Sequence, residues 1–97
     1  MGAEVFMTYS RGETAEEAFN EAVRRAQYDH GHSGYSGTIA EKDSFVIIKA
    51  PKDTTNFSGY ADKLIEDCDS RIDDKWGPAG CIPVGEDKFL FFGWASS

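Results

Sequence analysis

The chain has 97 residues, of which 17 are acidic and 10 are basic, so its formal net charge at pH 7 is −7. This length predicts one domain, residues 1–97, and excludes separate cofactor and catalytic domains. The negative charge argues against direct binding to nucleic acid or to an anionic membrane, and it permits a basic partner. The sequence shows neither a signal-peptide pattern nor a long apolar run, so we expect a cytoplasmic protein.

A strand and an amphipathic helix are predicted first. The β-branched and aromatic run Val5–Tyr9 ends at 10–12, where a turn is expected. Thr14 and Glu17 form a capping box, and Gly31 supplies a helix stop. Between them, apolar residues recur at helical spacing on one face: Ala15, Ala18, Phe19, Ala22, Val23 and Ala26.

The sequence from residue 38 onward predicts four more strands and one more helix. Residues 38–40 and 45–50 resemble the two strands of a hairpin around a polar turn, and 81–84 and 88–95 resemble a second hairpin. Ser58 is the expected N-cap of the second helix, whose outer side is acidic. Its apolar side carries Tyr60, Ala61, Leu64, Ile65 and Cys68.

The predicted order of elements is therefore β-α-β-β-α-β-β. This order is typical of an α+β protein with a ferredoxin-like β-α-β-β-α-β core and an extra C-terminal strand. We expect both helices on one face of a mainly antiparallel sheet. The order of the strands within the sheet is not predicted.

The last strand is apolar on both of its faces. Phe89 and Phe91 point to one side, whereas Leu90, Phe92 and Trp94 point to the other. Either the chain's own loops and turns cover the second face, or a second copy does. A chain of this size gains core by association, so we predict a homo-oligomer through the sheet or its apolar C-terminal strand.

Known catalytic and metal-binding patterns are weak in this sequence. His30 and His32 have a spacing that suits two metal ligands, but no third ligand is indicated beyond Asp29. Cys68 and Cys81 form no zinc cluster or disulfide framework, although a single bridge between them stays open, and each is better explained as a core residue. No nucleotide-binding glycine motif occurs. We therefore expect no catalytic residue, no metal and no cofactor.

The glycine-rich segment 33–38 is the strongest candidate for a binding site. Glycines there allow positive φ and anion-binding turns, Ser36 and Thr38 add hydroxyl groups, and Tyr35 offers a stacking face. The alternative is an ordinary connection after a helix. A second loop holds Trp76, and in a ferredoxin-like monomer the two loops lie at opposite ends of the sheet, so that an antiparallel dimer would be needed to join them. The predicted ligand contacts are His30, His32, Tyr35, Ser36, Gly37, Thr38, Lys75, Trp76 and Arg11.

Two segments together resemble a family of small bacteriophage and prophage accessory proteins. They are YDHGHSGYSGTIAEK at 28–42 and DDKWGPAGC at 73–81, together with the opening MGAEVF. The resemblance implies a phage protein that blocks host immunity. We expect a sponge that binds a nucleotide-derived signal without catalysis, which requires basic residues such as Arg11, Arg24, Arg25 or Lys75 near the glycines. The alternatives are an inhibitor whose acidic residues 62–74 mimic nucleic acid and bind a basic groove of a host nuclease, and an enzyme that degrades the signal.

Overall fold

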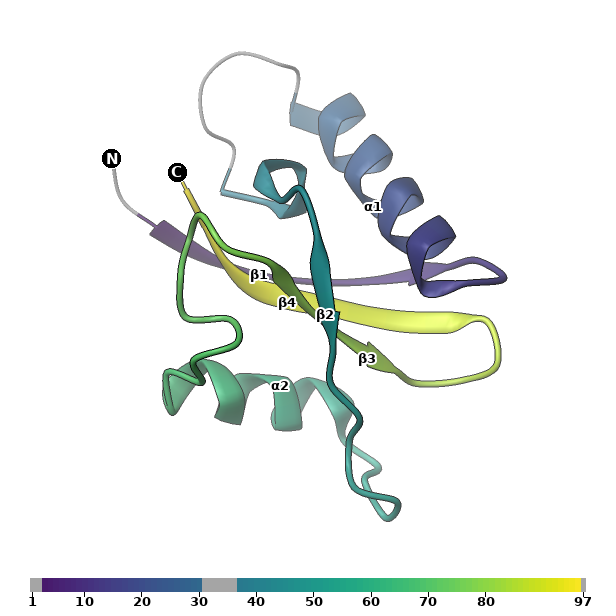
Figure 1. Cartoon of the computed structure of the whole chain (residues 1–97). Coiled ribbons are helices and arrows are strands. Elements are labelled where there is room, and N and C mark those ends of the chain that lie inside the picture. Colours follow the sequence, from purple (N-terminus) through teal and green to yellow (C-terminus); the bar gives the residue numbers. More distant parts are fainter. Residues whose placement is uncertain (1–2, 31–36, 97) are drawn as a thin grey trace.

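The structure is a computed structural model that describes residues 3–30 and 37–96, with only the backbone of His30. Its elements in chain order are β1 (Ala3–Arg11), α1 (Ala15–His30), the 3-10 turn η1 (Ile39–Glu41), β2 (Phe45–Ile47), α2 (Phe57–Glu66), β3 (Ala79–Pro83) and β4 (Lys88–Ser96) (Figure 1). The predicted α+β class and the order of its elements are confirmed, with η1 at the place of the short strand 38–40.

The four strands form one sheet in the order β1-β4-β3-β2. β4 is antiparallel to both of its neighbours, β1 and β3, and β2 is parallel to β3. The sheet is thus mainly antiparallel, as predicted. Since β4 lies between two paired neighbours, both of its edges are occupied within the chain. The open edges of the sheet belong to β1 and β2.

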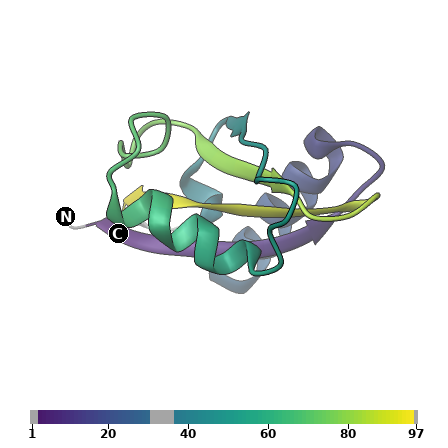
Figure 2. The same ribbon diagram turned by 90° about the horizontal axis from the view of Figure 1, so that it is seen from below.

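The two helices cover opposite faces of the sheet, so the prediction that both lie on one face is wrong. Figure 2 shows α2 in front of the sheet and α1 behind it. The physical reason is the path of the chain. β1, β2 and β3 all run parallel; the chain crosses the sheet in one direction from β1 to β2 and in the other from β2 to β3. Right-handed crossovers in opposite directions place their helices on opposite faces. The likeness to a ferredoxin-like core is limited to the class and the order of elements.

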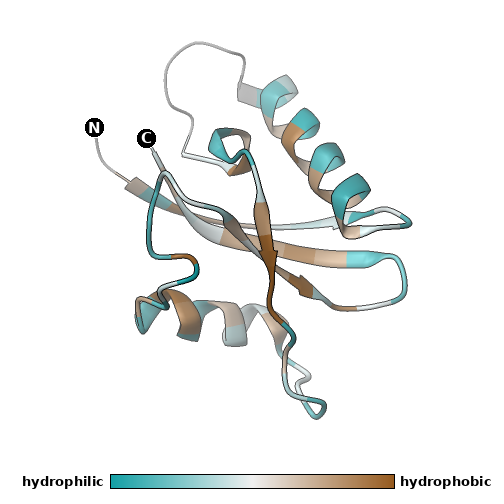
Figure 3. Cartoon of the chain, viewed as in Figure 1, coloured by the Kyte–Doolittle hydropathy of each residue, from teal (hydrophilic) through white to brown (hydrophobic). Residues whose placement is uncertain are grey.

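Each face has its own core. The α1 face buries Phe6, Ala18, Phe19, Ala22, Ile39, Ala79, Cys81, Phe89, Phe91 and Ala95. The α2 face buries Ile48, Ala61, Ile65, Ile72, Ile82, Leu90 and Phe92. The two apolar sides of β4 are therefore both covered within one chain. Figure 3 shows hydrophilic residues along α1. The sequence pattern that suggested a second copy is explained by α2.

The predicted first hairpin does not form. Thr38 accepts a hydrogen bond from the backbone N–H of Ala40 at 3.2 Å and thereby caps η1 instead of extending a strand. β2 pairs with β3 and ends at Ile47, three residues before the predicted end. α2 begins two residues earlier than predicted, because its N-cap is Asn56 rather than Ser58: the Asn56 side chain accepts from the N–H of Gly59 at 3.0 Å.

Candidate functional site

A cavity of about 380 Å³ lies along the open edge of the sheet, between β1 and α1. We call it the β1–α1 groove. β1 contributes four consecutive residues, Val5–Thr8, and α1 contributes residues that recur on one helical face: Ala22, Arg25, Ala26 and Asp29. Residues 37–39 close one end. The small side chains of Ala22 and Ala26 leave this space between helix and strand.

Gly37 and Thr38 form the closed end of the groove, as part of the site predicted from the sequence. Gly37 has a φ of 70°, which confirms that a glycine at this position adopts the left-handed conformation. Its N–H donates to the carbonyl of Ser96 at 2.8 Å. This donor is therefore used to fix the groove to the end of β4, and it is not available to an anion as the sequence analysis expected.

Arg25 lies at the other end of the groove. Its Nη2 donates to the carbonyl oxygen of Tyr9 at 3.0 Å, at the open edge of β1. Arg25 also lines two further cavities. One, which we call the basic cavity, has about 250 Å³ and is lined by Tyr9, Ser10, Arg11, Glu21, Arg25 and Lys88. The other has about 280 Å³ and is lined by Arg24, Arg25, Tyr28 and Asp29. The three cavities thus share one guanidinium.

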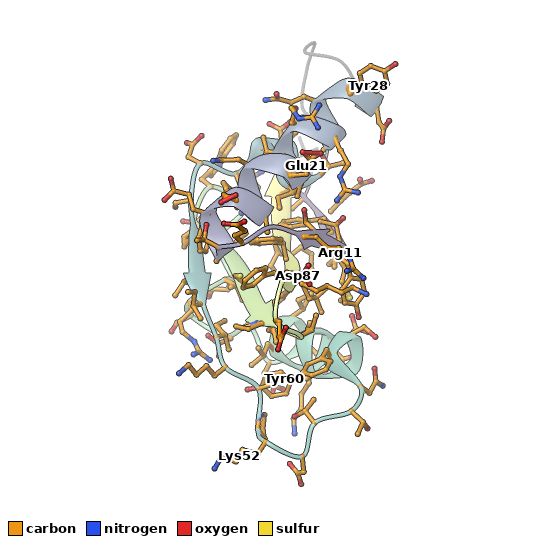
Figure 4. All side chains as sticks on the ribbon, turned by 90° about the vertical axis from the view of Figure 1, so that its right-hand side faces the viewer. Arg11, Glu21, Tyr28, Lys52, Tyr60 and Asp87 are labelled. Carbon is orange, nitrogen blue, oxygen red and sulfur yellow. The ribbon has the colours of Figure 1, made fainter. Side chains whose placement is uncertain are left out.

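Arg11 is separated from the glycine end by the length of β1. Ala3 pairs with Ser96 at the glycine end, and Arg11 pairs with Lys88 at the other. Eight residue steps of a strand correspond to about 27 Å. Figure 4 shows Arg11, Glu21 and Asp87 at the end of the molecule that faces the viewer. The structure therefore places Arg11 in the basic cavity and not beside Gly37.

Lys75 and Trp76 lie at the glycine end of the sheet, so the prediction that the two loops lie at opposite ends is wrong. The connection is Lys42, which directly follows η1. Its Nζ donates to three carbonyl oxygens of the second loop: Asp74 at 3.2 Å, Lys75 at 3.2 Å and Gly77 at 2.9 Å. Among the described residues that line the groove, neither Lys75 nor Trp76 is present. Trp76 is 60% exposed, with Lys75 Nζ 5.5 Å from its ring centroid.

The remaining predicted contacts lie outside the described residues. These are His32, Tyr35 and Ser36, together with the side chain of His30, whose backbone ends α1. They stay predictions from the sequence.

Two groups of residues were not singled out by the sequence analysis. Lys88 and Ser10 line the basic cavity, and neither has a motif around it that would have indicated this. Lys42 is only 3% exposed, although it stands in a polar run that is typical of a solvated turn. Burial lowers the pKa of Lys42, and the charge of Asp74 opposes this shift.

The described residues offer no group of three or more histidine, cysteine or acidic side chains that could hold a metal ion. Cys68 and Cys81 are free thiols. Cys81 is a buried core residue as predicted, but the prediction is wrong for Cys68, which is exposed because α2 ends at Glu66, before this position. Burial raises the pKa of the Cys81 thiol to about 12, so it is protonated at neutral pH. None of the described helices is long and apolar enough to cross a membrane.

The chain was compared with protein-family models, with curated proteins and with solved structures, and none of the three comparisons finds a match.

Proposed function

We propose that this protein is a non-catalytic binding protein that holds a nucleotide-derived small molecule in the β1–α1 groove. The single observation that carries the proposal is the shared position of Arg25, which borders the groove, the basic cavity and the Arg24–Tyr28 cavity in a chain of net charge −7. Local positive charge is what an acidic protein needs in order to bind a phosphorylated ligand.

The size and composition of the groove support a small-molecule ligand. Its volume of about 380 Å³ lies within the range of roughly 300–1,000 Å³ that is common for such sites. Phe6, which faces the α1 side of the sheet, offers apolar surface for a base, and Thr8 and Thr38 bring hydroxyl groups. Arg25 is the group suited to a phosphate, because a guanidinium can donate two parallel hydrogen bonds.

The resemblance to phage accessory proteins suggests a biological role for this binding. In an infected cell, a protein that holds an immune signal withholds it from its effector, and binding alone is sufficient for this effect. We propose this counter-defence role as a sponge of the host cytoplasm.

The experiment is a retention test. The protein is incubated with mononucleotides, cyclic dinucleotides and ADP-ribose, separated from free ligand, analysed by native mass spectrometry and then heated to release what it holds. Intact recovery supports the sponge. An altered product indicates an enzyme instead, and no retention of any compound contradicts the proposed function.

The matched variants are Arg25→Gln and Lys63→Gln. Both remove one positive charge; Arg25 borders the groove, whereas Lys63 is exposed on α2. Loss of a hydrogen bond to a charged group corresponds to at least tenfold weaker binding. We expect this loss for Arg25→Gln and unchanged retention for Lys63→Gln. Equal retention by the two variants would place the site elsewhere.

A second candidate function is supported by the outer surface of α2 and the residues after it. Their carboxylates at Asp62, Glu66, Asp67 and Asp73 are all exposed. Such a surface suits a protein inhibitor that occupies a basic groove of a host nuclease. Replacing these four residues by their amides should then abolish inhibition of the nuclease and leave ligand retention unchanged.

We also propose that the protein forms a homo-oligomer. β4 is paired on both edges and β1 borders the groove, so we place association through the sheet at β2, whose Ile47 side chain is 51% exposed. Sedimentation that finds a 10.7 kDa species at micromolar concentration would overturn it.

A further inference from the structure

We propose that the basic cavity is a phosphate site, and that the ligand of the groove extends along β1 into it. The ligand class is then a nucleotide with two or more linked phosphate groups. The identity of the ligand rests on the proposed function, whereas the phosphate site itself can be tested without it.

Three basic side chains from three elements meet at this cavity: Arg11 from β1, Arg25 from α1 and Lys88 from β4. Two of them are held in place by the same tyrosine. Arg25 Nη2 donates to the carbonyl of Tyr9 at 3.0 Å, and Lys88 Nζ lies 4.8 Å from the centroid of the Tyr9 ring. A site whose cations are already positioned loses less side-chain entropy when an anion binds.

Arg11 and Lys88 are directly opposed cross-strand partners. Two like charges in this arrangement destabilise a sheet. The nearby Asp87 offsets this repulsion only weakly, since its carboxylate lies 3.7 Å from Arg11 Nη1 and both side chains are more than 60% exposed. A bound phosphate between the two cations would remove the repulsion.

The one acidic residue that lines the cavity is already engaged. Both carboxylate oxygens of Glu21 accept from Arg24 Nη2, at 2.7 and 2.6 Å, and this hydrogen bonding lowers the pKa of Glu21. Arg25 Nε is farther away, at 3.9 Å. Because Arg24 balances the charge of Glu21, the cavity keeps the positive charge of Arg11, Arg25 and Lys88.

Ser10, a further residue of this lining, carries a buried hydroxyl group. The residue is 2% exposed, and its Oγ has no hydrogen-bond partner among the described residues. Buried hydroxyl groups without a partner are rare, because they lose their bonds to water and gain nothing in return. Because this Oγ atom is not accessible to solvent, Ser10 lines the basic cavity with its other atoms.

The two cavities are neighbours along one strand. Val5–Thr8 line the groove, Tyr9–Arg11 line the basic cavity, and Arg25 borders both. Six residue steps of a strand cover about 20 Å. A ligand that occupies both cavities therefore carries its phosphate groups away from its base, which a nucleoside diphosphate does and a nucleoside does not.

The test measures binding of inorganic pyrophosphate, adenosine and adenosine diphosphate by calorimetry to the wild-type chain and to Lys88→Gln, Arg11→Gln and the control Lys63→Gln. We expect pyrophosphate and the diphosphate to bind at least about tenfold more weakly to the first two variants, because each loses one charged hydrogen-bond donor. Adenosine binding should stay unchanged in all variants. Raising the salt concentration should weaken pyrophosphate binding. Circular dichroism confirms that each variant is folded.

The outcomes separate this proposal from the proposed function. Pyrophosphate that does not bind the wild-type chain, or that binds Lys88→Gln as well as Lys63→Gln, overturns the phosphate site. Pyrophosphate binding that depends on Lys88, without binding of any nucleotide, supports the phosphate site and contradicts the nucleotide function. Diphosphate that binds all variants equally supports the function and overturns the extension into the basic cavity.

Discussion

The two helices differ in what they leave open. α1 covers the side of the sheet next to the edge strand β1 and leaves three cavities that share Arg25. α2 covers the other face and turns exposed carboxylates outward, including those of Asp62 and Glu66. The net charge of −7 therefore describes neither side by itself. The proposed ligand site therefore lies on the α1 side, and the proposed basic partner would meet the α2 side.

The largest expected effect comes from β4, which supplies the core of both sides. Phe91 lies in the α1 cluster and Phe92 in the α2 cluster, and both are fully buried. We expect Phe91→Ala and Phe92→Ala each to lower the free energy of unfolding by about 3–5 kcal/mol. Urea denaturation measures this loss. A much smaller loss for Phe92→Ala would show that the α2 face contributes little to the core.

The same experiment tests how the α2 face is covered. If one chain buries both faces, the difference in urea midpoint between Phe92→Ala and the wild type is the same at every protein concentration. A loss that grows on dilution would instead show that a second copy covers part of this face.

Lys42 joins the glycine end of the groove to the loop after α2. We expect its substitution to cause the next largest loss of stability. Lys42→Met removes the donor to three carbonyl oxygens and leaves them without it in a buried place. We expect a loss of about 2–4 kcal/mol in the free energy of unfolding. Lys52→Met, at an exposed position, is the control and should change stability by less than about 0.5 kcal/mol. Equal stability of the two variants would contradict this role for Lys42.

Much of the fold was predictable because local patterns were strong. The N-cap at Thr14 was correct, since Thr14 Oγ1 accepts from the N–H of Glu17 at 3.1 Å, and both faces of β4 were read correctly as apolar. Which face of the sheet each helix covers was not predictable, because this follows from the strand order. The strand order in turn depends on contacts between distant residues. Residues 38–40 were misassigned because a threonine side chain that caps a turn looks like a strand former in sequence.

The candidate site was predictable only in part. A glycine with positive φ leaves a local signal, which identified Gly37. Arg25, Lys88 and Ser10 lie on three elements and converge only through the pairing of β1 with β4 and the path of α1. Nothing in the spacing of these residues along the chain expresses this convergence. The burial of Lys42 was hidden for the same reason, since its acceptors lie more than thirty residues away.

The end of α2 predicts a smaller effect of opposite sign. Cys68 follows the helix with a φ of 53°, in the left-handed region that favours glycine. We expect Cys68→Gly to raise the free energy of unfolding by about 0.5–1 kcal/mol and to leave retention of the ligand unchanged. Asp67→Gly is the control, because Asp67 has a φ of −78° and gains nothing from glycine. A stabilisation by both variants would show that the backbone conformation of Cys68 is not the cause.

The smallest effect depends on pH and concerns the acidic side alone. Asp69 accepts from Arg71 through its backbone N–H at 3.0 Å, its Nε at 2.9 Å and its Nη2 at 2.8 Å. The side-chain bonds of Arg71, followed by its backbone bond, lower the pKa of Asp69 from 3.8 to about 2. The folded state thus binds this proton less readily than the unfolded state, so the pair stabilises the protein above about pH 4, and this contribution is lost as the pH falls through about 2.

Because the ion pair is near the surface, Asp69→Asn should lower the free energy of unfolding at pH 7 by less than about 1 kcal/mol. The difference from the wild type should vanish only below about pH 2, and the exposed control Asp62→Asn should leave the free energy of unfolding at pH 7 nearly unchanged. A difference that persists unchanged at pH 2 would mean that Asp69 acts through its shape and not through its charge.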